Sequence, residues 1–322
     1  MLATRVAVVR GGPSSEYEVS MSTGTGVIDA LRKLGYTVSD ITVSKKGEWL
    51  VNGLVKKPET ALMTTDVVFI AMHGAYGEDG TIQRICERLH IPFTGSNSFP
   101  SSIAFNKDNT KRALLPHNIK TPKHVKITDK MIDDIDGLTY LIKNSFGPEY
   151  VLKPTSSGSS HGIIMVDSAG ALADAIAVMF ESSGEFMIEE RIRGREATCA
   201  VLEDFRNQSL YLLPAIEIIP PASHDFFAAD IKYTGETTEL VPGRFSFSEK
   251  STIAEATALV HTALGLTQYS RSDFMIRDGE VFFLEVNTLP GLTPHSLFPK
   301  AAEAVGLSFD GLIDHLVRTA RV

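Results

Sequence analysis

Cysteine is scarce in this sequence: Cys86 and Cys199 are the only two among 322 residues, and neither belongs to a Cys-x-x-Cys pair. Two cysteines cannot build a disulfide framework in a chain of this length, so the composition fits a reducing compartment. The first residues, MLATRVAVVRGG, lack the apolar core of a signal peptide. No apolar run approaches the roughly 20 residues that a membrane-spanning helix needs. We therefore expect a cytoplasmic protein that does not enter a membrane.

Positive charge is also in deficit. The 31 Lys and Arg residues face 39 Asp and Glu residues, which gives a net charge of −8. A chain of this sign repels phosphate backbones and anionic lipid, so nucleic acid and membrane surfaces are not expected as partners. A small anionic ligand stays possible, because a local group of basic side chains can still hold one. The Walker A pattern G-x-x-x-x-G-K-[ST] is absent.

The length exceeds what one compact core usually serves, so we expect two or three domains. Over the first hundred residues, apolar stretches typical of strands alternate with helical stretches. The stretches RVAVV at 5–9 and DVVFIA at 66–71 are almost continuously apolar, as in parallel strands that are covered on both faces. We interpret residues 1–100 as an open α/β domain with a parallel sheet.

The rest of the chain has a different character. A helical stretch over 101–115 precedes a unit of strands around one helix, and the sequence beyond that unit is richer in strands. We place a central domain at 101–185 and a carboxyl-terminal domain at 186–322. The predicted elements after the first helical stretch are the strands YVLKP (150–154), GIIMV (162–166) and FMIEE (186–190), helices over 169–181 and 250–264, and a closing pair of strands, RSDFMI and VFFLEV.

Two polar stretches could serve a nucleotide. In YVLKPTSSGSSHG, Lys153 ends an apolar strand, and the backbone and hydroxyls of the Ser/Gly loop that follows can hold a phosphate. A plain solvated hairpin explains this loop equally well. In FMIEERIRGRE, the carboxylates of Glu189, Glu190 and Glu196 can accept hydrogen bonds from a ribose or an adenine amino group. A solvated charge cluster at a domain edge is the commoner interpretation of such a stretch.

The closing strands carry a candidate metal site. Glu285 and Asn287 share one strand face, because side chains alternate along a strand. Together with Asp273 on the neighbouring strand they supply three oxygen donors, a set that suits Mg²⁺. Burying such groups without a cation or another partner would cost free energy. The alternative is a structural salt bridge between Glu285 and Arg271, although three oxygen donors exceed what one arginine needs.

The pairing of these two strands can be predicted from the same requirement. Asp273 faces the same cation as Glu285 only if the two residues are paired across the strands. A two-residue turn at Asp278-Gly279 would instead pair Asp273 with Leu284 and would direct the ligands to opposite faces. We therefore expect an odd loop over 278–280 with a bulge-type residue at positive φ.

Taken together, these motifs resemble those of the D-alanine–D-alanine ligases, a family of the ATP-grasp superfamily. The resemblance covers nearly the whole chain, in the family's order and spacing. It implies an α/β amino-terminal domain followed by two ATP-grasp domains that sandwich ATP. It also implies two Mg²⁺ ions, for which Mn²⁺ could substitute, D-alanine as substrate, and a homodimer. The similar segments are GGPSSEYEVS (11–20), HGAYGEDGTIQ (73–83), PFTGS (92–96), KPTSSGSSHG (153–162), KY (232–233) and SRSDF…LEVNTLPGLTPHS (270–296).

The resemblance also implies a role for each matched residue. In the nucleotide site, Lys107 and Lys153 contact the ATP phosphates, Glu189 and Glu196 lie at the adenine and ribose, and Asp273, Glu285 and Asn287 bind magnesium. In the substrate site, Glu16 lies near the ammonium of the first D-alanine, where Ser159, Lys232 and Tyr233 close a lid over it. Arg271 and the N–H of Gly291 stabilise an oxyanion, Ser296 and the backbone of Leu297 hold the carboxylate of the second substrate, and His73 lies near the reacting centre.

The implied chemistry explains why these groups are needed. A carboxylate is a poor acyl donor, so ATP first converts it to an acylphosphate, and the neutral amine of the second D-alanine then attacks. Because an acylphosphate hydrolyses readily, a lid must exclude water, and we expect this lid within 222–245. His161, the Ala229-Asp230 pair and the VPGRF segment at 241–245 depart from the family's usual residues. These departures bear on lid rigidity and turnover.

Three other interpretations stay open on the sequence alone. The chain could be a ligase of the same superfamily that joins a different carboxylate to an amine or hydroxyl. It could be an oxidoreductase, given its amino-terminal α/β unit, although RGGPSSE lacks the G-x-G-x-x-G pattern. It could also be a non-catalytic amino-acid-binding module, for which three metal donors would have no purpose.

Overall fold

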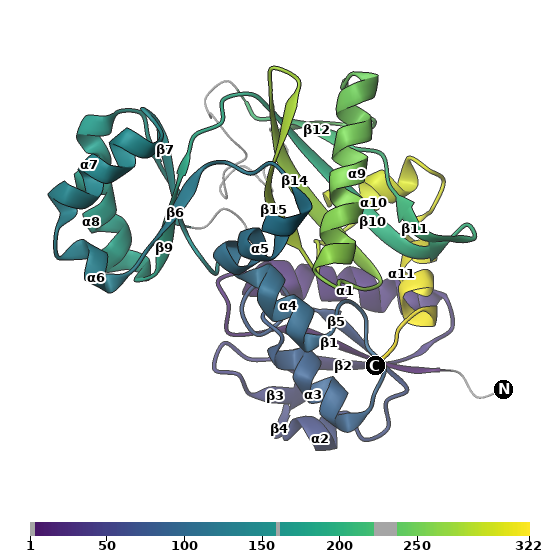
Figure 1. Cartoon of the computed structure of the whole chain (residues 1–322). Helices are drawn as coiled ribbons and strands as arrows, with labels where there is room; N and C mark the ends of the chain where they lie inside the picture. The colour runs from purple at the N-terminus through teal and green to yellow at the C-terminus, as the bar shows by residue number, and fades with distance from the viewer. Residues whose placement is uncertain (1–3, 159–161, 222–236) are drawn as a thin grey trace.

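The computed structural model describes residues 4–158, 162–221 and 237–322. These residues form three separate β-sheets, each with its own helices. In Figure 1 the five-stranded amino-terminal sheet lies at the bottom, a four-stranded sheet lies at the left and a six-stranded sheet lies at the upper right. The fold is therefore a mixed α/β arrangement of three bodies.

The amino-terminal sheet is built from β1 (Arg5–Gly11), β2 (Thr37–Val43), β3 (Trp49–Val51), β4 (Leu54–Lys56) and β5 (Val67–Ala71), in the order β4-β3-β2-β1-β5. Strands β2, β1 and β5 are parallel, as predicted, and β5 is buried along its whole length. The β3–β4 hairpin adds two antiparallel strands at one edge, so the complete sheet is mixed. Helix α1 (Tyr17–Lys33) packs on the parallel strands, and α2 (Pro58–Ala61) contacts β3.

Three short helices lead out of this sheet: α3 (Thr81–Leu89), α4 (Ser98–Phe105) and α5 (Lys107–Leu114). The sequence indicated one helical stretch over 101–115, but the structure divides it at Asn106, whose backbone is extended. The Asn106 side chain accepts a hydrogen bond of 3.0 Å from the N–H of Asn109 and caps α5. The break places Lys107 at the first position of a new helix. A 3₁₀ turn, Leu115–His117, ends this segment.

The four-stranded sheet is antiparallel, with the order β6-β9-β7-β8. Its strands are β6 (His124–Ile127), β7 (Tyr150–Pro154), β8 (Ile164–Val166) and β9 (Phe186–Glu190), and its helices are α6 (Asp129–Ile132), α7 (Ile135–Ser145) and α8 (Leu172–Ser183), with a 3₁₀ turn at Ala169–Ala171. Tyr150, Leu152 and Ile188 are buried in the core that this sheet forms with α7 and α8. Strand β9 lies just past residue 185, where we placed a domain boundary, yet it belongs to this sheet.

The six-stranded sheet is also antiparallel. It comprises β10 (Arg195–Phe205), β11 (Gln208–Leu212), β12 (Ile216–Ile219), β13 (Thr238–Leu240), β14 (Tyr269–Arg277) and β15 (Glu280–Asn287). Helix α9 (Phe247–Ala263) covers one face, over β10, β14 and β15. This helix begins with a capping box, in which Ser246 and Glu249 each bond to the backbone of the other. The face away from α9 forms one wall of the pocket described below.

The β14–β15 hairpin corrects one detail of our prediction. Asp273 pairs with Glu285, as expected, but the turn contains two residues, Asp278 and Gly279, both at positive φ. The register shifts between Asp273 and Phe274, where Leu284 is the extra residue on β15. A β-bulge within the strand, and not an odd loop, therefore brings the two carboxylates to one face.

The end of the chain returns to the amino-terminal body (Figure 1). After α10 (Leu297–Glu303), helix α11 (Phe309–Arg318) packs against α1. The carbonyl of Arg321 then accepts a hydrogen bond of 3.1 Å from the N–H of Phe93. One hydrophobic core runs through both bodies, since β1 and β5 share it with Tyr269 and Phe298.

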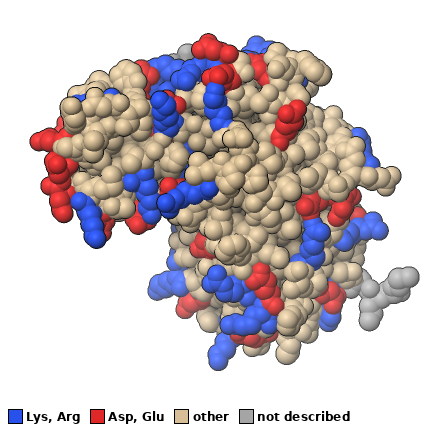
Figure 2. Space-filling model, in the orientation of Figure 1, with Lys and Arg blue, Asp and Glu red and all other residues tan. Residues whose placement is uncertain are grey.

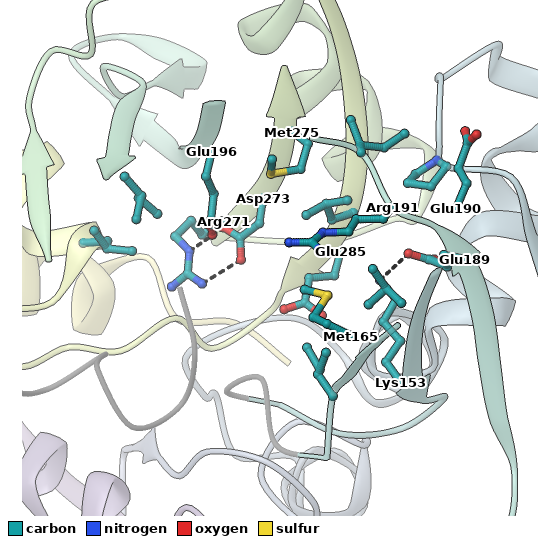
Figure 3. A pocket seen from close by; sticks show the side chains of 17 residues that line it. Lys153, Met165, Glu189, Glu190, Arg191, Glu196, Arg271, Asp273, Met275 and Glu285 are labelled. Carbon is teal, nitrogen blue, oxygen red and sulfur yellow. Dashed lines mark hydrogen bonds and ion pairs between the residues drawn. The ribbon is translucent and has the colours of Figure 1, made fainter. Parts of the chain in front are cut away.

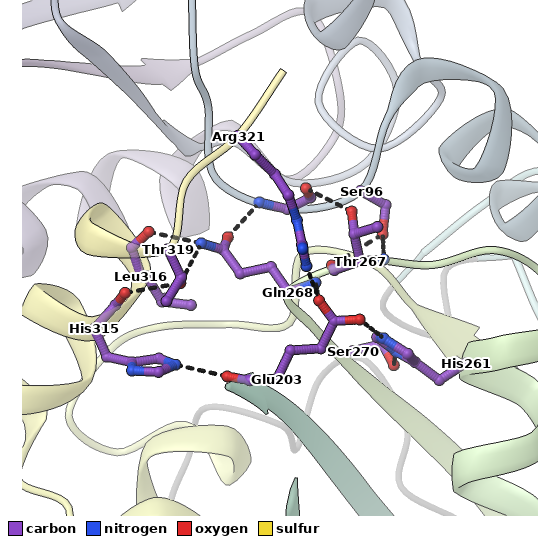
Figure 4. Close-up of polar contacts among 11 residues, drawn as sticks. Ser96, Glu203, His261, Thr267, Gln268, Ser270, His315, Leu316, Thr319 and Arg321 are labelled. Carbon is purple, nitrogen blue, oxygen red and sulfur yellow. Dashed lines mark hydrogen bonds and ion pairs between the residues drawn. The ribbon is translucent and has the colours of Figure 1, made fainter. Parts of the chain in front are cut away.

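A buried polar junction links the same two bodies (Figure 4). Gln268 accepts a hydrogen bond of 2.6 Å from the N–H of Gly95 and donates one of 2.6 Å to the carbonyl of Leu316. The carboxylate of Glu203 accepts from the N–H of Gln268 at 2.7 Å and pairs with Arg321. The amino-terminal and carboxyl-terminal bodies are therefore joined by both apolar and polar contacts.

Within the described ranges, no helix combines the length and the hydropathy that crossing a bilayer requires. Figure 2 shows basic and acidic side chains interspersed over the face in view.

Candidate active site

A pocket lies between the four-stranded and the six-stranded sheets (Figure 3). It holds about 930 Å³ of empty space, part of which is open to solvent. Each sheet lines it with the face that its own helices do not cover. Its charged lining residues are Lys153, Glu189, Glu190, Arg191, Glu196, Arg271, Asp273 and Glu285, and its apolar lining residues include Ile163, Met165, Ile192, Ile218, Met275 and Leu284. Such a pocket combines an apolar slot, which can take a flat ring, with charged groups, which can bind the polar parts of the same ligand.

The lysines at the pocket are buried and paired. Lys153 on β7 is 6% exposed, and its ammonium lies 2.6 Å from Oε2 of Glu189 on β9. The other carboxylate oxygen of Glu189 contacts the ammonium of Lys111 on α5. Burial alone would raise the pKa of Glu189, but the two ammonium groups outweigh this effect and hold it below the usual value. Glu189 is therefore an ionised carboxylate held between two lysines.

The candidate metal donors lie together on one face of the β14–β15 hairpin. Asn287 donates a hydrogen bond of 3.1 Å to Asp273, and Thr198 on β10 donates one of 2.6 Å to the same carboxylate. Arg271 binds Asp273 through two contacts, of 3.0 Å from Nε and 2.9 Å from Nη2. Arg271 thus forms a salt bridge with Asp273, whereas the alternative that we considered named Glu285 as its partner.

Glu285 lies beside the first lysine of α5. Its Oε2 is 3.1 Å from Nζ of Lys107, which is 7% exposed and also donates to the carbonyl of Ser157. A positive group therefore already occupies the position next to Glu285. Among the described residues, no three His, Cys, Asp or Glu side chains gather as a metal site, and the candidate set consists of two carboxylates and one amide. These oxygen donors still suit Mg²⁺, which is usually held by one or two carboxylates together with substrate phosphates.

Glu16 meets the two loops that the sequence singled out. It is 7% exposed and directly precedes α1. A methyl group built on Gly158, in the Ser/Gly loop, would lie only 2.6 Å from its Oε2, and one built on Gly74 would lie 2.9 Å away. Both loops therefore approach this carboxylate closely, each through a glycine. The structure thus brings a residue of the amino-terminal body to the Ser/Gly loop of the central one.

His73 is fixed by its surroundings in one neutral form. Its Nδ1 lies 3.0 Å from the carbonyl of Leu289, which can only accept a hydrogen bond, so Nδ1 carries the proton. Its Nε2 then accepts a bond of 2.9 Å from the hydroxyl of Thr23. Burial lowers the pKa of His73, although the charge of Glu16 and the bond to Leu289 raise it. Because Leu289 lies two residues past β15, its bond to His73 ties this histidine to the end of the strand that carries Glu285.

The loop after β15 is compact around Ser296. Its hydroxyl oxygen accepts from the N–H of Thr293 at 3.1 Å and shares a bond of 2.8 Å with the Thr293 hydroxyl. A methyl group built on Gly291 would lie 2.9 Å from this oxygen. Leu297 begins α10 and lines the pocket. The structure therefore brings Gly291 and Ser296, in the loop after β15, next to Leu297 at the start of α10, and Leu297 lines the pocket.

Three predicted residues, Ser159, Lys232 and Tyr233, lie outside the described residues. The same holds for His161 and for the Ala229-Asp230 pair. The remaining part of the expected lid includes β13 and the VPGRF segment, where Arg244 forks onto Glu217 with contacts of 3.0 and 3.1 Å. The atypical arginine of that segment is therefore anchored by its own ion pair.

The sequence reasoning missed two buried charged residues. Lys111 was hidden in a polar helix, where only its spacing of four from Lys107 could have drawn attention to it. Glu78 belongs to the quoted stretch HGAYGEDGTIQ, and it accepts a hydrogen bond of 3.2 Å from the N–H of Gly74. Burial, reinforced by the charge of Glu16, raises the pKa of Glu78 well above its usual value. Both residues became apparent only through their burial.

Two antiparallel sheets that face each other across a nucleotide-sized pocket define the ATP-grasp fold. Comparison with known proteins then identifies the family within this fold. The family model described as D-ala D-ala ligase N-terminus matches residues 5–64 and 52–96, and the one described as D-ala D-ala ligase C-terminus matches residues 117–318. A D-alanine--D-alanine ligase of Carboxydothermus hydrogenoformans is 36% identical over 316 residues, which cover 97% of this chain and 97% of that protein.

Solved structures agree with these matches. The VanG D-Ala:D-Ser ligase of Enterococcus faecalis superimposes with a TM-score of 0.82 at 29% identity, covering 98% of this chain and 99% of that one. The D-alanine--D-alanine ligase of Bacillus anthracis complexed with ATP gives a TM-score of 0.80 at 32% identity, with 98% and 97% covered. The chain belongs to the D-alanine–D-alanine ligase family and is an enzyme of the ligase class.

Proposed function

We propose that this enzyme joins two D-alanine molecules into D-alanyl-D-alanine, with conversion of ATP to ADP and phosphate, for the synthesis of peptidoglycan precursors. The observation that carries this proposal is the pocket between the two sheets. Charged side chains from both sheets line it, among them Lys153 on β7 and Arg271 on β14. The Glu16 and His73 region adjoins it, because His73 bonds to the carbonyl of Leu289, two residues past the end of β15. An adenine fits the apolar slot, and the phosphates fit the lysines.

In the first step, a carboxylate oxygen of the first D-alanine attacks the γ-phosphorus of ATP, and the bond to the ADP oxygen breaks. The product is an acylphosphate. We assign Lys153 and Lys107 to the phosphates, and each would then exchange part of its present carboxylate contact for a phosphate oxygen. Their burial makes each such contact stronger than it would be in water.

Asp273, Glu285 and Asn287 would hold Mg²⁺, or Mn²⁺ in its place, and the family resemblance implies two such ions. When bound, the metal would neutralise charge on the phosphates of ATP. The chain itself keeps the donors in position, because Asp273 is fixed by Arg271, Thr198 and Asn287. Lys107 supplies positive charge next to Glu285.

In the second step, the neutral amine of the second D-alanine attacks the acyl carbon, phosphate leaves and one proton is released. Arg271 and the N–H of Gly291 stabilise the oxyanion, while Ser296 and the backbone of Leu297 hold the carboxylate of the attacking molecule. Glu16 accepts from the ammonium of the first D-alanine. The lid residues Ser159, Lys232 and Tyr233 remain predictions, as does the homodimer.

The test measures ADP release and product together. D-Alanine should stimulate ADP release and give D-alanyl-D-alanine by mass spectrometry, whereas L-alanine should do neither. Retention of Lys232 and Tyr233 predicts an amine as the attacking group, so D-lactate offered with D-alanine should give little ester near neutral pH. Ester as the main product would refute the assignment of the second subsite.

A second candidate product has one specific observation in its favour. The VanG protein, whose name specifies a D-Ala:D-Ser ligase, superimposes over 98% of this chain with a TM-score of 0.82. D-Serine is also an amine nucleophile, so the site chemistry described above accommodates it. Competition between equal concentrations of D-alanine and D-serine, with both dipeptides quantified, separates the two candidates. D-Alanyl-D-serine in excess would reassign the second substrate.

A further inference from the structure

Helix α5 connects the two walls of the pocket through two lysines. Lys107 and Lys111 are four residues apart and therefore lie on the same face of the helix. Lys107 contacts Glu285 on β15 of the six-stranded sheet, and Lys111 contacts Glu189 on β9 of the four-stranded sheet. One helix thus places an ammonium group against each sheet. The family resemblance gave a role to Lys107 and none to Lys111.

Lys111 lies behind the pocket. Lys153 and Glu189 line the pocket (Figure 3), whereas Lys111 reaches Glu189 from the side of α5. The side chains of Lys111 and Glu189 are only 1% and 2% exposed. Each oxygen of the Glu189 carboxylate therefore has its own lysine: Oε1 has Lys111, and Oε2 has Lys153 at 2.6 Å. Glu189 is therefore the pocket residue with which Lys111 is in direct contact.

The charges of these three residues determine what the pocket presents to a ligand. With Lys111 in place, Lys111 and Glu189 cancel, and Lys153 carries one positive charge that is not balanced within the trio. Without Lys111, Lys153 and Glu189 would form a neutral pair in a buried setting. A phosphate would then compete with the full negative charge of Glu189 for the ammonium of Lys153. In a low-dielectric site such a competition costs more than it would in water.

We propose that Lys111 is a positioning residue for ATP: it neutralises Glu189 from behind the pocket and thereby leaves the ammonium of Lys153 available to a nucleotide phosphate. The inference rests on the proposed use of ATP. It assigns to Glu189, in addition to any contact with the nucleotide, the task of holding Lys153 in its orientation.

The protonation states agree with this role. Burial lowers the pKa of Lys111 to about 8, although Glu189 raises it, and the nearby Lys153 and Lys107 lower it further. Lys111 is therefore charged at neutral pH. Glu189 is ionised there as well, because its two lysines hold its pKa below the usual value. The trio thus carries a net charge of about one positive unit under the conditions in which the enzyme is assayed.

The first measurement compares two variants of α5. Lys111→Met removes the charge and keeps a chain of similar length, whereas Arg112→Met removes a neighbouring charge whose side chain is 72% exposed. Calorimetric titration with the non-hydrolysable ATP analogue AMP-PNP and Mg²⁺ should show affinity reduced about tenfold or more for Lys111→Met, as expected for one lost charge-assisted contact. The KM for D-alanine should change by less than about twofold. Arg112→Met should bind the analogue like the unmodified enzyme.

The second measurement separates a charge effect from a packing effect. In Glu189→Gln the carboxylate no longer competes for Lys153, so adding Lys111→Met to that variant should change AMP-PNP affinity by less than about twofold. A role of Lys111 in packing alone predicts the same loss in both backgrounds, and that result would overturn the proposal. In the double variant both Glu189 and Lys111 are replaced by neutral residues, so neither leaves the other as an unpaired buried charge. The comparison of the double variant with Glu189→Gln therefore tests the proposal even if Lys111→Met by itself fails to fold.

Failure of this inference can be distinguished from failure of the proposed function. If the unmodified enzyme does not release ADP with D-alanine, the proposed function is wrong. If it does, and Lys111→Met binds AMP-PNP as tightly as the unmodified enzyme, only the role of Lys111 is wrong.

Discussion

At the scale of single residues, three carboxylates of the candidate site are matched by basic side chains. Asp273 pairs with Arg271, Glu285 with Lys107, and Glu189 with two lysines. Buried charges stay ionised when they are paired, so these contacts keep the site assembled before any ligand arrives. When a polyanion binds, the basic side chains then exchange carboxylate partners for ligand oxygens, and no side chain needs to change its charge.

Glu285→Gln should abolish ligation and leave the fold intact. The amide fills the same space, but it lacks the negative charge that a Mg²⁺–ATP site needs. The variant should unfold at a temperature close to that of the unmodified enzyme, and ADP release with D-alanine should fall by a factor of about 100 or more, the loss expected when a group that stabilises transition-state charge is removed. Glu280→Gln on the same strand is the control, since Glu280 is exposed and pairs with Lys120. Near-normal ligation by folded Glu285→Gln would end the metal assignment.

Gly291→Ala should impair the reaction with little effect on stability. The added methyl group would lie 2.9 Å from Oγ of Ser296, which its two bonds to Thr293 hold in place. The loop must therefore shift, and the N–H of residue 291 moves with it. We expect a kcat lowered about tenfold or more, a loss similar in kind to that of an oxyanion donor. Steady-state kinetics would contradict this placement if kcat were unchanged.

At the scale of elements, the bulge in β15 decides the geometry of the candidate metal site. The Asp278-Gly279 turn sets one register and the bulge at Leu284 changes it, so that Asp273 meets Glu285. Leu284 and Glu285 consequently both line the pocket, although they are neighbours in a strand. The Asp-Gly turn thus keeps its preferred two-residue hairpin, and the bulge turns Glu285 to the same face of the sheet as Asp273.

The capping box of α9 offers a test at this scale. Ser246→Ala removes the hydroxyl that accepts from the N–H of Glu249, and it should lower the free energy of unfolding by about 1 kcal/mol. Urea denaturation measures this change. Ser251→Ala, which removes a hydroxyl bonded only along the helix surface to Glu255, should stay within about 0.5 kcal/mol of the unmodified protein. Equal effects of the two substitutions would show that the box contributes nothing.

At the scale of the whole molecule, the junction of Figure 4 makes stability depend on pH. Burial lowers the pKa of His261 from its ordinary 6.5 to about 4. Between these two values the unfolded chain binds the proton and the folded chain does not, so the free energy of unfolding should fall as the pH drops from 6.5 to 4. The full difference corresponds to about 3 kcal/mol at most. Glu203, 3.2 Å from Nε2, favours the charged form and makes this figure an upper limit.

Denaturation of the unmodified protein and of His261→Gln at pH 7, 6 and 5 checks this expectation. Glutamine does not titrate, so the variant should lose less stability than the unmodified protein on acidification. The pKa values of His73, which is buried, and of His124 and His315, which are partly buried, are also lowered by desolvation, and these residues add a shared decline to both proteins. Parallel curves for the two proteins would remove His261 as a source of the acid sensitivity.

The sequence predicted those features that depend on local pattern. Continuous apolar runs predicted β1 and β5, and strand alternation put Glu285 and Asn287 on one face. The motifs in their order led to the ATP-grasp fold and the ligase family, which the comparisons confirm. The break at Asn106 and the bulge at Leu284 were missed, because each depends on a single residue within an otherwise regular pattern.

By itself, therefore, the sequence determined the elements, their order and the residue types available for chemistry, since these follow from hydropathy period and turn residues read along the chain. The tertiary structure alone decided which charges meet. Lys111 reaches Glu189 across 78 positions, and Gly158 approaches Glu16 from another body of the molecule. Such contacts depend on how the three sheets pack against one another, and the burial that strengthens these charge interactions arises only from that packing.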